Sequence, residues 1–306
     1  MPVIIPEDLI SKETLGRENI FTMEEKRAKS QDIRALKIGI VNLMPTKKET
    51  EVQLLRLISN TPLQIEIDLI AMASYKSSNY QKHLEKFYVS YEEIKDKKYD
   101  GLIITGAPLE HKAYDDIIYW EELKKIFEFA KKNVYSTLFI CWSAIAALDY
   151  YYGVNIDSLD KKIFTVNQYY KESSDPLFLG FDDSFYMPNS RYKTIRKEEV
   201  ERIPKLKVLL SDDKMGATII KSIDNRFVFN LNHLEYDTNT LDDEYRRDKK
   251  NGLGTKPAEN YYLDDDPNKK IIQRWRSTGY IFFNNWINHY VYQHTPYKIS
   301  DVETII

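Results

Sequence analysis

The sequence predicts an α/β protein in which a mostly parallel sheet is flanked by helices, with a cysteine at a sharp turn between a strand and a helix. Short runs of β-branched and apolar residues alternate with segments whose apolar residues recur at helical spacing. The joins are short and contain Gly or Pro, which indicates right-handed crossovers between parallel strands. In such a sheet, functional groups gather at the carboxyl ends of the strands.

The first half of the chain carries the clearest strand and helix signals. Residues 1–35 are polar and lack a clear period, so we interpret them as an N-terminal arm. The alternation of strands and helices begins at Leu36. We expect strands at residues 36–43, 64–72, 99–105 and 137–140, and helical segments at residues 49–59, 88–94, 120–132 and 143–152.

The second half changes rhythm after Gly153. Shorter strands joined by polar turns are followed by helices near the end of the chain. No stretch is rich enough in Gly, Pro or Ser to divide the chain, so we predict a single domain over residues 1–306. Its parts are the arm, an α/β core at 36–237 and a C-terminal helical decoration at 238–306. The expected elements are strands at 163–168, 208–210, 217–221 and 226–231, and helices at 244–250 and 280–292.

Composition narrows the class of protein. The chain has 306 residues, 42% of them hydrophobic, so a large core can form. The net charge is −3 and both signs are interspersed, so we expect no nucleic acid and no membrane as partner. A single Cys excludes an intrachain disulfide and a cysteine-based metal cluster, and we predict no metal site. The first residues lack the pattern of a signal peptide, which predicts a cytoplasmic protein.

Cys141 stands where the strand at 137–140 turns into the helix at 143–152 with no loop between them. Such a joint forces its hinge residue into a strained conformation and exposes the side chain above the sheet, as in nucleophile elbows. The free N–H groups at a helix start also stabilise a thiolate. The alternative is a small buried core cysteine. The direct join favours a nucleophile.

A cysteine nucleophile needs a base, and His233 is the best candidate among the five histidines. We expect it at the end of the strand that starts at Arg226. Glu235 lies two positions further, where strand geometry would point both side chains to one face. A carboxylate beside an imidazole sets its tautomer and stabilises the imidazolium. A solvated surface pair is the competing interpretation.

The turn after the strand at 99–105 should approach Cys141 from the neighbouring strand. It consists of Gly106-Ala-Pro-Leu109 and Glu110. A tetrahedral intermediate on the sulfur needs two hydrogen-bond donors. We predict the backbone N–H groups of Trp142 and Leu109 as this oxyanion hole, although the turn could equally be only a tight connection.

These residues resemble the class I glutamine amidotransferase architecture, which is flavodoxin-like, and the flanking motifs resemble the homoserine O-acyltransferases of methionine biosynthesis. The resemblance covers essentially the whole chain. The motifs that carry it are Asn42-Leu-Met-Pro45, Lys48-Glu-Thr-Glu51, Thr105-Gly-Ala-Pro-Leu109, Phe139-Ile-Cys-Trp142, Gly180-Phe-Asp-Asp183, Asn189-Ser-Arg-Tyr192, Glu244-Tyr-Arg-Arg-Asp248, Asn260-Tyr-Tyr262, Asp265-Asp-Pro267, Trp275-Arg-Ser277 and Tyr290-Val-Tyr-Gln293.

The resemblance implies a role for each reacting group. Cys141 would form an acyl thioester, His233 would accept protons and Glu235 would orient the imidazole. It also implies substrate contacts from three residues that by pattern alone would pass as two solvated charges and a turn residue: Lys162, Ser190 and Arg247. The chain departs from the family's usual residues at Asn232, Leu234, Asn189 and Ile145, which leaves the reacting groups intact.

The family also implies the partners. They are the small molecules L-homoserine and an acyl-CoA, and no bound cofactor is expected. The protein could form a homodimer. The residue at Glu110 is Glu in family members that use acetyl groups and Gly in those that use succinyl groups, so we predict a homoserine O-acetyltransferase with acetyl-CoA as co-substrate. The alternatives are homoserine O-succinyltransferase, a glutaminase-type hydrolase on the same fold, and a binding protein with an inert Cys141.

Overall fold

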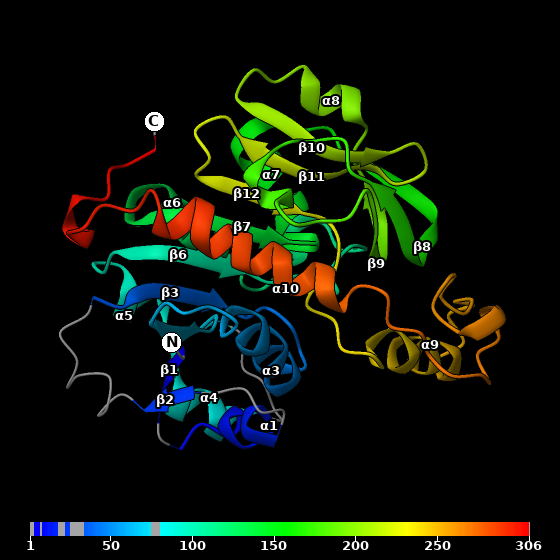
Figure 1. Ribbon diagram of the computed structural model, residues 1–306, viewed down its shortest axis with the longest axis horizontal. Helices are drawn as coiled ribbons and strands as arrows, with labels where there is room; N and C mark the ends of the chain where they lie inside the picture. Colours follow the sequence, from blue (N-terminus) through cyan, green and yellow to red (C-terminus); the bar gives the residue numbers. More distant parts are fainter. Residues whose placement is uncertain (1–2, 7, 18–21, 25–33, 75–79, 306) are drawn as a thin grey trace.

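The computed structural model describes residues 3–6, 8–17, 22–24, 34–74 and 80–305. Within these residues, ten strands form one sheet in the order β10-β11-β12-β7-β6-β3-β4-β1-β2, with β5 paired to β4 (Figure 1). Its central strands are parallel, and β10 and β11 are antiparallel additions beside β12. The predicted α/β fold with a mostly parallel sheet is confirmed.

From Leu36 to the cysteine turn the expected elements are present with bounds that shift by a few residues, except at 88–94, where a short strand precedes the helical turn. The helical segments at 81–87 and 114–116 were not predicted. The elements of the first half are β1 (Val3–Ile5), α1 (Ser11–Arg17), β2 (Thr22–Glu24), β3 (Leu36–Val41), α3 (Lys47–Ile58), β4 (Ile65–Ile70), α4 (Gln81–Phe87), β5 (Tyr88–Val89), α5 (Tyr91–Ile94), β6 (Tyr99–Ile104), η1 (Tyr114–Asp116), α6 (Trp120–Asn133), β7 (Val134–Ile140) and α7 (Trp142–Tyr152).

The second half adds a separate hairpin and the helices that complete the molecule. Its elements are β8 (Asp157–Tyr170), η2 (Pro176–Phe178), β9 (Ser184–Thr194), α8 (Lys197–Glu201), β10 (Leu206–Asp212), β11 (Gly216–Ser222), β12 (Phe227–Asn230), α9 (Thr240–Lys250), η3 (Leu263–Asp265), α10 (Arg276–Asn285), the π-helical turn η4 (Trp286–Tyr292) and η5 (Ile299–Asp301).

Helices cover both faces of the sheet, and the side chains of β7 pack against helices on each face. Leu138 and Ile140 belong to the same buried cluster as α3 and α10, whereas Phe139 between them belongs to the cluster formed with α6 and α7. Successive side chains of a strand point to opposite faces, so a run of apolar residues fills two cores at once. This explains why the strand has no polar alternation.

Two segments that were expected at the periphery of the molecule belong to the sheet or to the core beside it. The expected N-terminal arm supplies β1 and β2 to the sheet, and β1 pairs in parallel with β4. Its residues 1–2, 7, 18–21 and 25–33 lie outside the described part of the chain. The expected C-terminal decoration includes α10, whose Phe282 and Phe283 are fully buried against one face of the sheet. Three-residue strands are too short to show a period, so the sequence of the arm gives no sign of them.

The hairpin β8–β9 forms a second, two-stranded antiparallel sheet. The strand predicted at 163–168 is the central part of β8, whereas β9 had no strand signal because Pro188 and Asn189 interrupt its apolar pattern. Ser190 therefore lies in a strand and not in a turn. No helix in the described part of the chain is long and apolar enough to cross a membrane.

Candidate active site

Cys141 adopts the strained backbone of an elbow, with φ 51° and ψ −113°, directly between β7 and α7. Its N–H donates to the Asn230 carbonyl at 2.7 Å. The Ser143 hydroxyl accepts from the Ile140 N–H at 3.1 Å and donates to the Ile104 carbonyl at 2.7 Å, which secures the turn from below. A non-glycine residue in this region costs about 1–3 kcal/mol, which the surrounding hydrogen bonds offset. The predicted elbow backbone is confirmed, but the expected exposure of the side chain above the sheet is wrong, since Cys141 is only 4% exposed.

The parallel strands on either side of β7 bring two further segments to Cys141. β6 and β12 both pair with β7, so their carboxyl ends lie at the same edge of the sheet. Gly106, after β6, leaves room for this convergence, since a Cβ atom there would lie 3.3 Å from the Cys141 Cβ and 3.7 Å from the His233 Cε1. A larger residue would press on both reacting groups.

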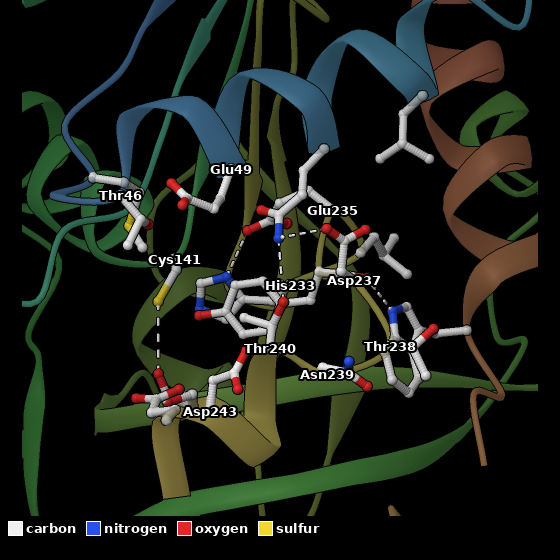
Figure 2. Close-up of a pocket in the computed structure, with 18 of the residues that line it drawn as sticks. Thr46, Glu49, Cys141, His233, Glu235, Asp237, Thr238, Asn239, Thr240 and Asp243 are labelled. Carbon is white, nitrogen blue, oxygen red and sulfur yellow. Dashed lines mark hydrogen bonds and ion pairs between the residues drawn. The ribbon is translucent and has the colours of Figure 1, made fainter. Parts of the chain in front are cut away.

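His233 lies beyond the strand that was expected to carry it. β12 ends at Asn230, and His233 starts a turn that is closed by the Tyr236 N–H donating to the His233 carbonyl at 3.3 Å. The predicted strand geometry is thus wrong, because the chain leaves the sheet three residues early to reach Cys141. His233 and Glu235 are nevertheless paired, since the His233 Nδ1 lies 2.6 Å from the Glu235 Oε1 (Figure 2).

The charges around His233 favour its protonated form. Burial opposes a charged imidazole, but the Cys141 thiolate and the Glu235 carboxylate together raise the pKa of His233 well above its usual value. An imidazolium beside the cysteine stabilises the thiolate, which is the nucleophilic form. Figure 2 shows Cys141, His233 and Glu235 gathered beneath α3. The three side chains can therefore act as a nucleophile, a proton carrier and its orienter.

The two predicted oxyanion donors differ in availability. Trp142 is the first residue of α7, so its N–H has no acceptor within the helix. The Leu109 N–H donates to the Ala107 carbonyl at 2.8 Å. The Gly106-Ala-Pro-Leu109 turn must release this bond before Leu109 can serve an oxyanion, so its assignment stays a prediction.

A second cluster of charged side chains is formed by β8, β9 and α9 around one carboxylate, Glu244. The Lys162 Nζ lies 2.6 Å from the Glu244 Oε1, and the Ser190 hydroxyl donates to the same oxygen at 2.9 Å. The Arg247 guanidinium lies 3.5 Å from this oxygen and 2.6 Å from Asp248. All three predicted substrate residues thus converge on Glu244, which the sequence presents only as part of a motif.

Both clusters border a single cavity of about 960 Å³. Cys141, His233, Ser190, Glu244 and Arg247 line it, whereas Lys162 is not among the described residues that do. The Lys162 side chain is 9% exposed, and although burial disfavours its charge, Glu244 and Asp248 raise its pKa above the usual value. Lys162 is therefore placed to hold the Glu244 carboxylate from behind.

Glu110 borders the cavity on the side of the Gly106 turn. Burial raises the pKa of Glu110 to about 7, although the positive charges of His233 and Lys162 act in the opposite direction. The residue therefore changes charge near neutral pH. Within the described residues, no group of three or more His, Cys, Asp or Glu side chains could hold a metal ion.

The fold is similar to that of a solved glutamine amidotransferase of low sequence identity. The similar structure is the crystal structure of a glutamine amidotransferase from Thermotoga maritima, with a TM-score of 0.53 and 11% identity over 85% of this chain and 100% of the other. At 11% identity this similarity shows the fold alone. Relatives of higher identity show the family.

The family model described as homoserine O-succinyltransferase matches residues 2–297. The chain is 48% identical over 308 residues to the homoserine O-acetyltransferase of Petrotoga mobilis, with 100% of both chains covered. It is also 48% identical over 301 residues to a protein of that name from Bacillus cereus, with 98% of this chain and 100% of the relative covered. The chain belongs to the homoserine O-succinyltransferase family, which confirms the family expected from its motifs.

Proposed function

We propose that this protein is a homoserine O-acetyltransferase, which moves an acetyl group from acetyl-CoA to the hydroxyl of L-homoserine and so supplies O-acetyl-L-homoserine for methionine biosynthesis. Full-length relatives of that name support the proposal. The observation that carries it is the elbow Cys141 beside the His233–Glu235 pair, in one cavity with the charged groups of Glu244 and Arg247.

The first half-reaction transfers the acetyl group to the enzyme. The Cys141 sulfur attacks the thioester carbonyl of acetyl-CoA. The position of Trp142 at the start of α7 supports its N–H as a donor to the oxyanion that forms. The carbon–sulfur bond to CoA then breaks, and the His233 imidazolium gives its proton to the departing thiolate. Neutral His233 and an acetylated Cys141 remain.

The second half-reaction delivers the group to homoserine. Neutral His233 takes the proton of the homoserine hydroxyl, whose oxygen attacks the Cys141 thioester. Collapse of the tetrahedral intermediate releases O-acetylhomoserine and the Cys141 thiolate beside an imidazolium. Glu235 stabilises the protonated imidazole in both halves, since its carboxylate stays 2.6 Å from Nδ1. No bound cofactor is needed.

The zwitterionic end of homoserine fits the charges at the other side of the cavity. Arg247 can hold the α-carboxylate through a bidentate contact. Glu244 lies 3.5 Å from Arg247 and accepts from Ser190, so its carboxylate can take the ammonium group of the same molecule. One amino acid can thus bridge both charges while its hydroxyl points towards Cys141.

Glu110 supports the choice of acetyl-CoA over succinyl-CoA. A succinyl group brings its own carboxylate, which would meet an ionised Glu110 at the wall of the cavity. At about 4 Å and an effective dielectric of about 20, the repulsion is roughly 4 kcal/mol as an upper figure. The family name favours the second candidate, homoserine O-succinyltransferase, in which this penalty would have to be absent.

A direct assay tests the proposal. The protein is incubated with L-homoserine and a panel of acyl-CoAs, and product esters are identified by mass. We expect O-acetylhomoserine as the main product. With acetyl-CoA and no acceptor, a stable adduct of one acetyl group on Cys141 should accumulate, whereas rapid hydrolysis would indicate a hydrolase. Preferred use of succinyl-CoA would establish the second candidate.

The remaining proposal concerns larger partners. We propose that neither a nucleic acid nor a membrane is a partner, because acidic and basic residues are interspersed along the chain. Whether the chain forms a homodimer is decided by experiment. Sedimentation of the purified chain at several concentrations distinguishes a dimer from a monomer of 306 residues.

A further inference from the structure

Tyr236 lies flat against the catalytic imidazole. The ring centroids of His233 and Tyr236 are 4.0 Å apart and the planes differ by 15°. This is the shortest ring separation among the aromatic pairs of the described residues. The contact covers a face of the imidazole, whereas Glu235 contacts only its Nδ1 edge. Two kinds of restraint therefore act on one ring.

Tyr236 is itself held from behind. The Trp275 indole N–H donates to the Tyr236 carbonyl at 2.9 Å, and Trp275 is almost completely buried. Helix α10 also approaches the same turn closely, since a Cβ atom at Gly279 would lie 2.7 Å from the Leu234 carbonyl oxygen. The turn that carries His233 and Tyr236 is thus fixed to the core on its outer side.

The hydroxyl of Tyr236 does not explain this arrangement. No hydrogen bond of this hydroxyl is found among the described residues, and Tyr236 borders the cavity. Its surroundings are acidic: Glu244, Glu235, Cys141 and Glu110 act on it electrostatically. The hydroxyl therefore contributes no fixed contact, and the ring is the part that touches the imidazole.

On the basis of the proposed function, we propose that Tyr236 is a positioning residue whose aromatic ring holds the plane of His233 and stabilises its protonated form. Contacts at the ring edge, with Glu235 and with Cys141, leave the imidazole free to rotate about the line that joins them, and a flat contact restrains that rotation. A cation over an aromatic face is also attracted to the ring's electrons. The ring thus favours the imidazolium that pairs with the Cys141 thiolate.

The test compares Tyr236→Phe, which keeps the ring, with Tyr236→Leu, which removes it. Tyr151→Leu is the matched control, because Tyr151 also stacks on a ring, that of Phe227 at 4.8 Å and 20°, within the opposite core. The first readout is the rate at which iodoacetamide alkylates Cys141 across pH. Since Cys141 is the single cysteine, the signal is unambiguous and requires no acyl donor.

In Tyr236→Leu we expect alkylation at neutral pH to fall severalfold, kcat to fall about tenfold and the KM for homoserine to stay within about threefold. The alkaline limb of the pH–rate profile should move down by about 0.5–1 unit, because the imidazolium loses its proton more readily. Other charges around His233, namely Cys141, Glu235 and Glu110, are unchanged. Tyr236→Phe and Tyr151→Leu should keep the native profile.

A folded Tyr236→Leu protein with the native alkylation and pH profiles would overturn the proposal. Equal losses in Tyr236→Phe would overturn it too, since the hydroxyl would then be the working group. If Tyr236→Leu does not fold, Tyr236→Met, whose flexible side chain refills the space, decides on the same readouts. A native protein that alkylates normally but makes no acylated homoserine would refute the proposed function alone.

Discussion

Backbone turns at the carboxyl ends of β7 and β12 bring together one group of side chains, which consists of Cys141, His233 and Glu235. Side chains carried by β9 and α9 form a second group, which consists of Ser190, Glu244 and Arg247. The first group is almost completely buried. The second is open on one side, where the Arg247 side chain is 57% exposed. The cavity therefore has two unlike parts. We call them the nucleophile half, with Cys141, His233 and Glu235, and the substrate half, with Ser190, Glu244 and Arg247.

Under the proposed function, the first group carries out the chemistry and the second binds homoserine. In the nucleophile half, strand register determines which atoms approach, so the reacting groups are in place before substrate arrives. In the other half, a carboxylate is surrounded by Lys162, Ser190 and Arg247, and a substrate with matching charges can exchange for some of these contacts. Damage to the first half should stop both half-reactions, whereas damage to the second should affect mainly homoserine.

The strongest way to break this division is to remove the nucleophile. Cys141→Ala should lower turnover by about 10⁴-fold or more, and Cys141→Ser nearly as much, because an alkoxide is much harder to form beside the same imidazole. Steady-state rates and the mass of the acetyl-enzyme measure the loss. Activity close to native in the alanine variant would exclude the covalent route.

Glu235→Gln should lower kcat by about 10- to 1000-fold with the fold retained. A neutral amide no longer stabilises the imidazolium, so the raised pKa of His233 falls and the alkaline limb of activity moves to lower pH. Both half-reactions should slow together, which single-turnover acylation and deacylation can measure. If the variant unfolds or works normally, the carboxylate has a different role.

Arg247→Lys should raise the KM for homoserine by about 10- to 100-fold while acetylation of Cys141 by acetyl-CoA stays unchanged. A lysine cannot copy the two parallel hydrogen bonds of a guanidinium. Arg246→Lys is the control, because Arg246 pairs with Asp242 outside the cavity and should tolerate the change. Equal damage to the two half-reactions would place Arg247 in the nucleophile half.

Glu110 lies between the two halves and should give the smallest effect, about a tenfold change in donor preference. Glu110→Gln removes charge at nearly constant volume, and Glu110→Gly also opens space, so their comparison separates the two causes. Because the pKa of Glu110 is about 7, the preference for acetyl-CoA should strengthen as pH rises through 7 and weaken below it. A ratio independent of pH and of both variants would show that Glu110 is not the selector.

The nucleophile half could be predicted from the sequence, because each of its features depends on residues that are close to one another in the chain. A buried strand that meets a helix without a loop forces the elbow at Cys141, and His233 and Glu235 are only two residues apart. The substrate half was not. Glu244 and Ser190 are 54 positions apart and meet only because the fold brings a side chain of α9 to one of β9, and β9 gave no strand signal.

The sequence by itself predicted the alternation of strands and helices between Leu36 and Gly153, the elbow at Cys141 and the pairing of His233 with Glu235, since these follow from local patterns and short spacings. Only the tertiary structure decided that Lys162 supports Glu244, that partial burial raises the pKa of Glu110, and that Tyr236 covers the face of His233. These properties depend on burial and on contacts between distant elements. Neither is encoded in the spacing of neighbouring residues.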